Sequence, residues 1–163
     1  MRVAVIGAGG IGGYFGGRLA AAGTDVTFVA RGAHRDALRA NGLRIESGLG
    51  DVVVPAKTVE DAAQIGAVDV VIVAVKLWDT QAAVGMIAPL LHDETAVISL
   101  QNGVSKDDRL REAVGKEHVV GGVAYIAAVI DRPGVIRHTG AIQRLVLGEF
   151  VRRRQAGLSS AAL

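Results

Sequence analysis

The feature that most constrains the fold is a glycine-rich turn directly after a short apolar segment near the N-terminus. Residues 3–6 are all apolar and mostly β-branched, which is typical of a buried central strand. The turn that follows consists of Gly7, Ala8, Gly9, Gly10, Ile11 and Gly12. An amphipathic helical pattern begins inside this turn. A G-x-G-x-x-G turn that joins a strand to a helix predicts a dinucleotide-binding fold of the Rossmann type.

The glycines of this turn each have a physical reason. Gly7 permits the tight turn, Gly9 lets a pyrophosphate approach the backbone, and Gly12 lets the helix pack closely on the strand. The helix then directs its free N–H groups and the positive end of its dipole toward the phosphates. A glycine-rich turn that binds nothing is the simpler alternative.

Alternating strand and helix patterns along the chain indicate an α/β fold. The predicted strands are residues 3–6, 26–30, 43–47, 51–55, 68–75, 95–100, 119–130, 135–138 and 143–150. The predicted helices are residues 10–22, 33–40, 79–91 and 106–114. Half of the residues are apolar and only 4% are aromatic, as expected for a parallel sheet covered on both sides. We therefore expect a doubly wound, mostly parallel sheet with helices on both faces.

The change of composition near the C-terminus predicts a domain boundary. Residues 1–150 are expected to form the dinucleotide-binding domain. From residue 151 the sequence becomes polar and basic, with arginines at 152–154, and then ends in small residues. Residues 151–163 are therefore expected to be a linker and the start of a further domain.

Composition argues against several classes of function. The chain has no cysteine, which removes disulfides and thiolate chemistry and is compatible with a reducing cytoplasm. The formal charge is +2 and no basic stripe is interleaved with aromatics, so nucleic acid is not an expected partner. The longest charge-free run, residues 3–17, is too short and glycine-rich to span a bilayer, so no membrane is expected either. The four histidines show no metal-ligand spacing, so no metal site is predicted.

The end of the second predicted strand indicates which dinucleotide is bound. A domain that prefers NAD usually ends this strand with Asp or Glu, which binds the ribose hydroxyls. Here the strand ends at Ala30 and Arg31 follows, so a guanidinium could pair with a ribose 2′-phosphate. The sequence therefore favours NADP(H). Arg35 is an alternative ligand, and a solvated surface arginine is the simpler explanation.

Two further polar residues follow later strands at the edge where open α/β sheets bind ligands. Lys76 follows residues 68–75 and could contact a cofactor or a substrate carboxylate. Asn102 follows residues 95–100 and carries an amide suited to a ribose or a carboxamide. Position alone equally allows a lysine at a helix start and an Asn-Gly turn. Trp78 is expected to pack against its neighbours, and His138 to be an exposed strand residue.

Together these segments resemble the ketopantoate reductase (2-dehydropantoate 2-reductase) family over residues 1–150. The resemblance rests on residues 7–12, Arg31, 75–76, 100–103 and 121–129, and on the hairpin at Pro133-Gly134. It implies that residues 7–12, Arg31 and Lys76 bind NADP, and that Asn102 contacts both cofactor and substrate. It also implies a backbone contact to the cofactor near Ala128.

The resemblance further implies reduction of the ketone of 2-dehydropantoate, a small 2-oxo acid, by hydride from NADPH. This is a cytoplasmic step toward pantothenate and coenzyme A. In the family the catalytic lysine lies in a helical C-terminal domain, and no matching segment occurs before Leu163. That domain is therefore expected to be absent and the catalytic residues stay unassigned. The apolar face that it would cover predicts self-association as a homo-oligomer, or poor solubility.

Other functions fit the same pattern. The chain could be a catalytically incomplete NADPH-binding module that senses or regulates, or part of a related dehydrogenase acting on another 2-oxo acid. A Rossmann methyltransferase is a weaker alternative, because position 31 has no acidic residue to hold the ribose of its cofactor.

Overall fold

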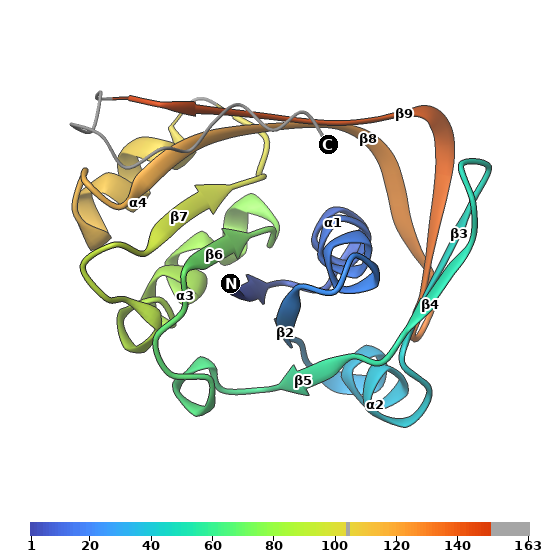
Figure 1. Ribbon diagram of the computed structural model, residues 1–163. Helices are drawn as coiled ribbons and strands as arrows, with labels where there is room; N and C mark the ends of the chain where they lie inside the picture. Colours follow the sequence, from blue (N-terminus) through green and yellow to red (C-terminus); the bar gives the residue numbers. More distant parts are fainter. Residues whose placement is uncertain (104, 151–163) are drawn as a thin grey trace.

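Nine strands form one curled sheet in the computed structural model, which describes residues 1–103 and 105–150 (Figure 1). The strands are β1 Arg2–Ile6, β2 Asp25–Val29, β3 Leu43–Ser47, β4 Val52–Val54, β5 Lys57–Val59, β6 Val70–Val73, β7 Ala96–Ser99, β8 Val119–Arg132 and β9 Val135–Glu149. The α-helices are α1 Gly10–Ala21, α2 Gly32–Asn41, α3 Thr80–Gly85 and α4 Lys106–Val114. Short 3₁₀ helices are η1 Ala62–Gln64, η2 Leu77–Asp79 and η3 Ala88–Leu90. None of the helices in these two ranges is long and apolar enough to cross a membrane.

The strand order confirms the mostly parallel, Rossmann-like topology. The order across the sheet is β4-β3-β9-β8-β7-β6-β1-β2-β5. Strands β5, β2, β1, β6, β7 and β8 are parallel, and β8–β9 and β3–β4 are antiparallel. Strand β1 lies between β2 and β6, so the chain reverses its direction of winding beside β1. Ligands bind at such a switch point in open α/β sheets.

Helix α1 lies inside the curl of the sheet (Figure 1) because glycines on its surface let several strands approach it. A Cβ atom at these positions would come within 3.1 Å of a side chain on four different strands: Gly12 near Val5 (β1), Gly13 near Ile136 (β9), Gly16 near Phe28 (β2) and Gly17 near Ile45 (β3). Close packing of this kind leaves no room for added methyl groups. The glycines therefore set how tightly the sheet wraps around the helix.

Helices cover both faces of the sheet, as predicted. One apolar core surrounds α1 on the concave side and includes Tyr14 and Phe28, both fully buried. A second core lies between the sheet and the helices on its outer side, and includes Leu90 of η3 and Leu110 of α4. Burial of a large apolar side chain of this kind contributes about 1.5–3 kcal/mol to stability.

Three predicted elements differ from the structure. The helix predicted at 79–91 is replaced by the end of η2, by α3 and by η3. The break between α3 and η3 agrees with Pro89, which has no N–H to donate to the carbonyl of Gly85 four residues earlier. The strands predicted at 135–138 and 143–150 are one strand, β9. Its pairing with β8 shifts between Ala128↔His138 and Ile126↔Gln143, so the interruption is a bulge. Strand β5, a short edge strand, was not predicted.

Two side chains lie in environments opposite to those expected. His138 is 4% exposed, with its Nδ1 2.9 Å from Ser47 Oγ and its Nε2 3.1 Å from the carbonyl oxygen of Ile142. The prediction of an exposed residue was wrong, because α1 brings the Tyr14 ring to a centroid distance of 4.9 Å. Trp78 was expected to pack, yet it is 81% exposed on η2. This indole has no covering element among the described residues.

Candidate functional site

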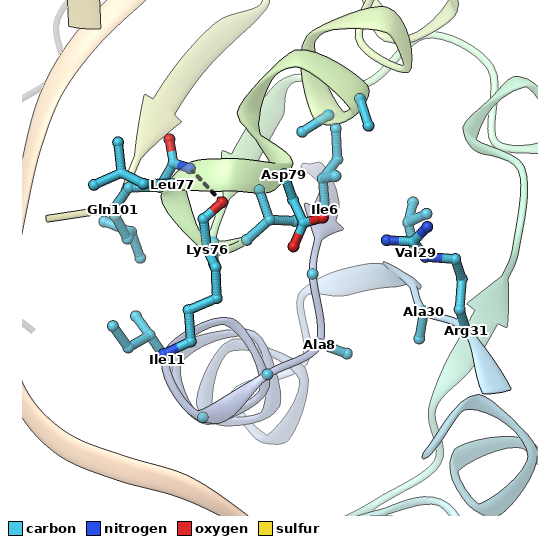
Figure 2. A pocket seen from close by; sticks show the side chains of 18 of the residues that line it. Ile6, Ala8, Ile11, Val29, Ala30, Arg31, Lys76, Leu77, Asp79 and Gln101 are labelled. Carbon is cyan, nitrogen blue, oxygen red and sulfur yellow. Dashed lines mark hydrogen bonds between the residues drawn. The ribbon is translucent and has the colours of Figure 1, made fainter. Parts of the chain in front are cut away.

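A cavity of about 620 Å³ lies at the carboxyl ends of β1, β2, β6 and β7 (Figure 2). It brings together all but one of the predicted site residues. Those that line it are Gly7, Ala8, Gly9, Gly10, Ile11, Arg31, Lys76, Asn102 and Ala128. Gly12 does not line the cavity, because it packs against the sheet. The remaining lining includes residues 74–79, which follow β6, residues of α2 and α3, and Ile130 on β8.

The turn between β1 and α1 has a geometry that suits an anion site. Gly7 has φ +97°, which only glycine adopts readily, and its N–H donates to the carbonyl of Val29 at 3.1 Å. A Cβ atom at Gly12 would lie 2.9 Å from the Cβ of Ala74. At Gly9 a Cβ atom would have no neighbour within 4 Å, so this glycine faces open space. The observation fits a pyrophosphate that approaches the backbone there.

Strand β8 forms the opposite side of this turn. A Cβ atom at Gly10 would lie 2.9 Å from the Cα of Val129 and closer still to the carbonyl oxygen of Ala128. The backbone of β8 therefore touches the first turn of α1, and Ala128 lies at the cavity wall. The sequence alone could not reveal this contact, because 118 residues separate Gly10 from Ala128.

The two candidate arginines have different environments. Arg35 is ion-paired with Asp36 at 2.6 Å and with Glu60, and both carboxylates raise the pKa of Arg35 above its usual value. Arg31 lies at the start of α2 beside Ala30 and lines the cavity (Figure 2). Its guanidinium has no ion-pair partner among residues 1–103 and 105–150. The geometry thus favours Arg31 over Arg35 as a ligand for an anion.

Lys76 extends from the end of the β6 segment toward the first turn of α1, where Ile11 lies (Figure 2). The carboxylate of Asp79 also lines the cavity. The charged lining is therefore Arg31 and Lys76 against Asp79, next to the positive end of α1. The net positive charge suits an anionic ligand.

Gln101 connects the segments that carry Lys76 and Asn102. Its side chain is 7% exposed, and its Nε2 donates to Thr80 Oγ1 at 2.8 Å and to the carbonyl of Lys76 at 3.3 Å, the bond dashed in Figure 2. Its Oε1 accepts a hydrogen bond from Ser99 at 3.2 Å. No role was predicted for Gln101 from the sequence. The available signal was its position between a buried strand and Asn102, because a polar side chain buried there needs hydrogen-bond partners.

His34 is a second cavity residue that was not predicted from the sequence. Its Nε2 lies 2.9 Å from the carbonyl oxygen of Ala8, and its Nδ1 accepts the N–H of Gly134 at 3.1 Å. Burial lowers the pKa of His34, and the bond to Ala8 opposes this effect in part. Its position in the first turn after Arg31 was the available signal, but the partners lie 26 and 100 residues away.

Comparison with known proteins connects this site with one family. The family model described as "Ketopantoate reductase PanE/ApbA" matches residues 3–152. The chain is 39% identical over 150 residues to the uncharacterized oxidoreductase YkpB of Bacillus subtilis (strain 168), covering 92% of this chain and 49% of that protein. It is 38% identical over 170 residues to 2-dehydropantoate 2-reductase of Mesorhizobium japonicum, covering 91% of this chain and 52% of that protein.

A solved structure shows the same fold. The crystal structure of 2-dehydropantoate 2-reductase from Geobacter metallireducens GS-15 superimposes with a TM-score of 0.88 at 35% identity, covering 95% of this chain and 51% of that one. The chain spans about half the length of the curated relatives it matches. The sequence match covers nearly all of the described residues, and the curled sheet is shared. The chain therefore belongs to the ketopantoate reductase PanE/ApbA family.

Proposed function

We propose that this chain is the NADPH-binding part of an oxidoreductase that reduces 2-dehydropantoate to pantoate in the cytoplasm, a step toward pantothenate and coenzyme A. The observation that carries the proposal is Arg31, an arginine without an ion-pair partner among the described residues. It lies at the same cavity as the glycine turn that opens α1. Residues 1–150 form the cofactor domain in this proposal. The predicted linker, residues 151–163, lies outside the described residues.

The chain's own groups have distinct roles in this function. The N–H groups at the start of α1 bind the pyrophosphate, and Arg31 pairs with the 2′-phosphate of the adenosine ribose. Lys76 and Asn102 follow β6 and β7 at the same cavity, and we assign them to the nicotinamide side. The carbonyl of Ala128 limits the cavity beside the first turn of α1. The bound cofactor supplies a hydride for the ketone.

Substrate recognition is assigned to Asn102 alone. Its amide can donate one hydrogen bond and accept another, so it can orient a 2-oxo acid and the cofactor at the same time. Lys76 is kept as a cofactor ligand, because its side chain extends toward the first turn of α1 (Figure 2). No general acid is assigned to a described residue.

The test is a titration of the chain with NADPH and NADH, followed by energy transfer from Trp78 to the reduced nicotinamide. Trp78 is the only tryptophan and lines the cavity. Arg31→Ala is expected to weaken NADPH binding about tenfold or more and to leave NADH binding unchanged, because one charge-assisted contact is lost. Arg35→Ala is the matched control and should preserve the preference.

The outcomes separate the parts of the proposal. A preference for NADPH that survives Arg31→Ala would show that another group reads the 2′-phosphate. A folded chain that binds neither dinucleotide would overturn the assignment of the cavity as a cofactor site.

A further inference from the structure

His34 joins three segments that are distant in sequence at the wall of the cofactor cavity. It belongs to the first turn of α2, contacts Ala8 in the glycine turn, and contacts Gly134 in the turn between β8 and β9. The side chain is half-buried and lines the cavity. The residue therefore touches the turn that binds phosphate without belonging to it.

The two partners define the state of the imidazole ring. The N–H of Gly134 can only donate, so Nδ1 of His34 must carry a lone pair. The carbonyl of Ala8 can only accept, so the proton of the neutral ring lies on Nε2. The lowered pKa of His34 agrees with this neutral form. One tautomer thus satisfies both contacts.

The bond to Ala8 also sets the direction of the next N–H group. In a trans peptide the carbonyl oxygen and the following amide hydrogen point in opposite directions. When the oxygen of Ala8 is held toward His34, the N–H of Gly9 points away from His34. Gly9 lines the cavity, and a Cβ atom built on it would have no neighbour within 4 Å, so there is room beside this peptide for a ligand. If the Ala8–Gly9 peptide rotated, the carbonyl oxygen of Ala8 would take the place of the N–H of Gly9. An oxygen there would repel a phosphate, whereas the N–H binds it.

We propose that His34 is a positioning residue that holds the Ala8–Gly9 peptide in the orientation that binds the cofactor pyrophosphate. The inference rests on the proposed NADPH function and extends it to a residue outside the glycine motif. The contact to Gly134 orients the ring, and the contact to Ala8 acts on the peptide. The effect is confined to the pyrophosphate and does not extend to the 2′-phosphate at Arg31.

The experiment compares two ligands that share only part of the site. NADPH carries both the pyrophosphate and the 2′-phosphate, whereas adenosine 2′-monophosphate carries the 2′-phosphate alone. His34→Leu is expected to weaken NADPH binding about tenfold and to leave adenosine 2′-monophosphate binding unchanged. Arg31→Ala is the control, and it should weaken binding of both ligands.

A pair of amide variants separates the two contacts of the ring. The amide of His34→Gln reaches the place of Nε2 and can donate to Ala8, whereas the amide of His34→Asn reaches only the place of Nδ1. We expect the Gln variant to retain NADPH affinity within about threefold and the Asn variant to match the Leu variant. Both amide variants keep the test valid if His34→Leu fails to fold.

Each result bears on a different part of the inference. If the wild-type chain binds NADPH and the folded His34→Asn variant binds it equally well, His34 does not have this role. The proposed function then stays intact. Equal weakening of both ligands by the His34 variants also overturns it, because the effect would then be general to the fold. If the wild-type chain binds neither ligand, the proposed function and the inference fall together.

Discussion

At the scale of single residues, the three motif glycines have different reasons to be glycine. Gly7 adopts a positive φ, Gly12 packs against the sheet, and Gly9 faces an open cavity. The first two are requirements of folding, whereas in the proposed function the third is a requirement of the ligand. The same short motif therefore combines structural and functional constraints that mutation can separate.

Gly9→Ala and Gly12→Ala form a matched pair for this separation. Gly9→Ala should change the free energy of unfolding by less than about 1 kcal/mol, since the added methyl group meets no atom within 4 Å. It should nevertheless weaken NADPH binding at least tenfold, because the methyl group occupies the place of the pyrophosphate. Gly12→Ala should lower the free energy of unfolding by about 1–3 kcal/mol through overpacking. Urea unfolding and NADPH titration measure both effects, and equal destabilisation by the two changes would contradict this separation.

At the scale of elements, the site depends on contacts between segments that are distant in sequence. The glycine turn is held by β2 through the bond from Gly7 to Val29, by α2 through His34, and by β8 through Gly10 and Ala128. The turn and helix themselves follow from local sequence. Their partners follow only from the topology, which places β2 and β8 on opposite sides of β1.

The His34 contact predicts that stability depends on pH in a defined direction. The pKa of His34 is lowered in the folded chain relative to its ordinary value of about 6.5, so the unfolded chain takes up the proton first. The stabilising contribution is therefore complete above about pH 6.5 and is lost as the pH falls from there through the folded-state pKa. Thermal unfolding of the wild type, measured from about pH 5 to about pH 8, should show that stability decreases as the pH falls below the ordinary pKa of histidine. If the stability of His34→Gln depends on pH in the same way, the dependence comes from another group.

At the scale of the whole molecule, the hairpin of β8 and β9 presents apolar side chains to solvent. Val123 pairs with Val146 across the hairpin, and Tyr125 follows on the same face. The exposed fractions of Val123, Val146 and Tyr125 are 49%, 39% and 53%. An exposed apolar face of this kind is typical of an interaction surface.

The chain is therefore expected to self-associate through this face, a second copy being the simplest partner in a pure sample. Sedimentation velocity over a range of concentrations should show a shift toward larger species, and the double change V123E and Y125E should restore the monomer. Val53, which is 60% exposed on β4, supplies the control V53E. A wild-type chain that stays monomeric throughout, or an equal effect of V53E, would rule out this face.

The sequence by itself determined most of the local elements and the candidate residues of the site. β-Branched runs and the glycine turn depend on neighbours along the chain, so the strands, the motif and the candidate Arg31 could be picked out from the pattern. Position alone left the roles of Lys76 and Asn102 open, and the family resemblance is what singled them out. The tertiary structure decided which groups meet. It paired Arg35 with Asp36 and Glu60, buried His138 beneath Tyr14, and brought His34 to Ala8 and Gly134. Such contacts depend on how the sheet curls around α1, and packing between distant segments leaves no periodic signal in the sequence.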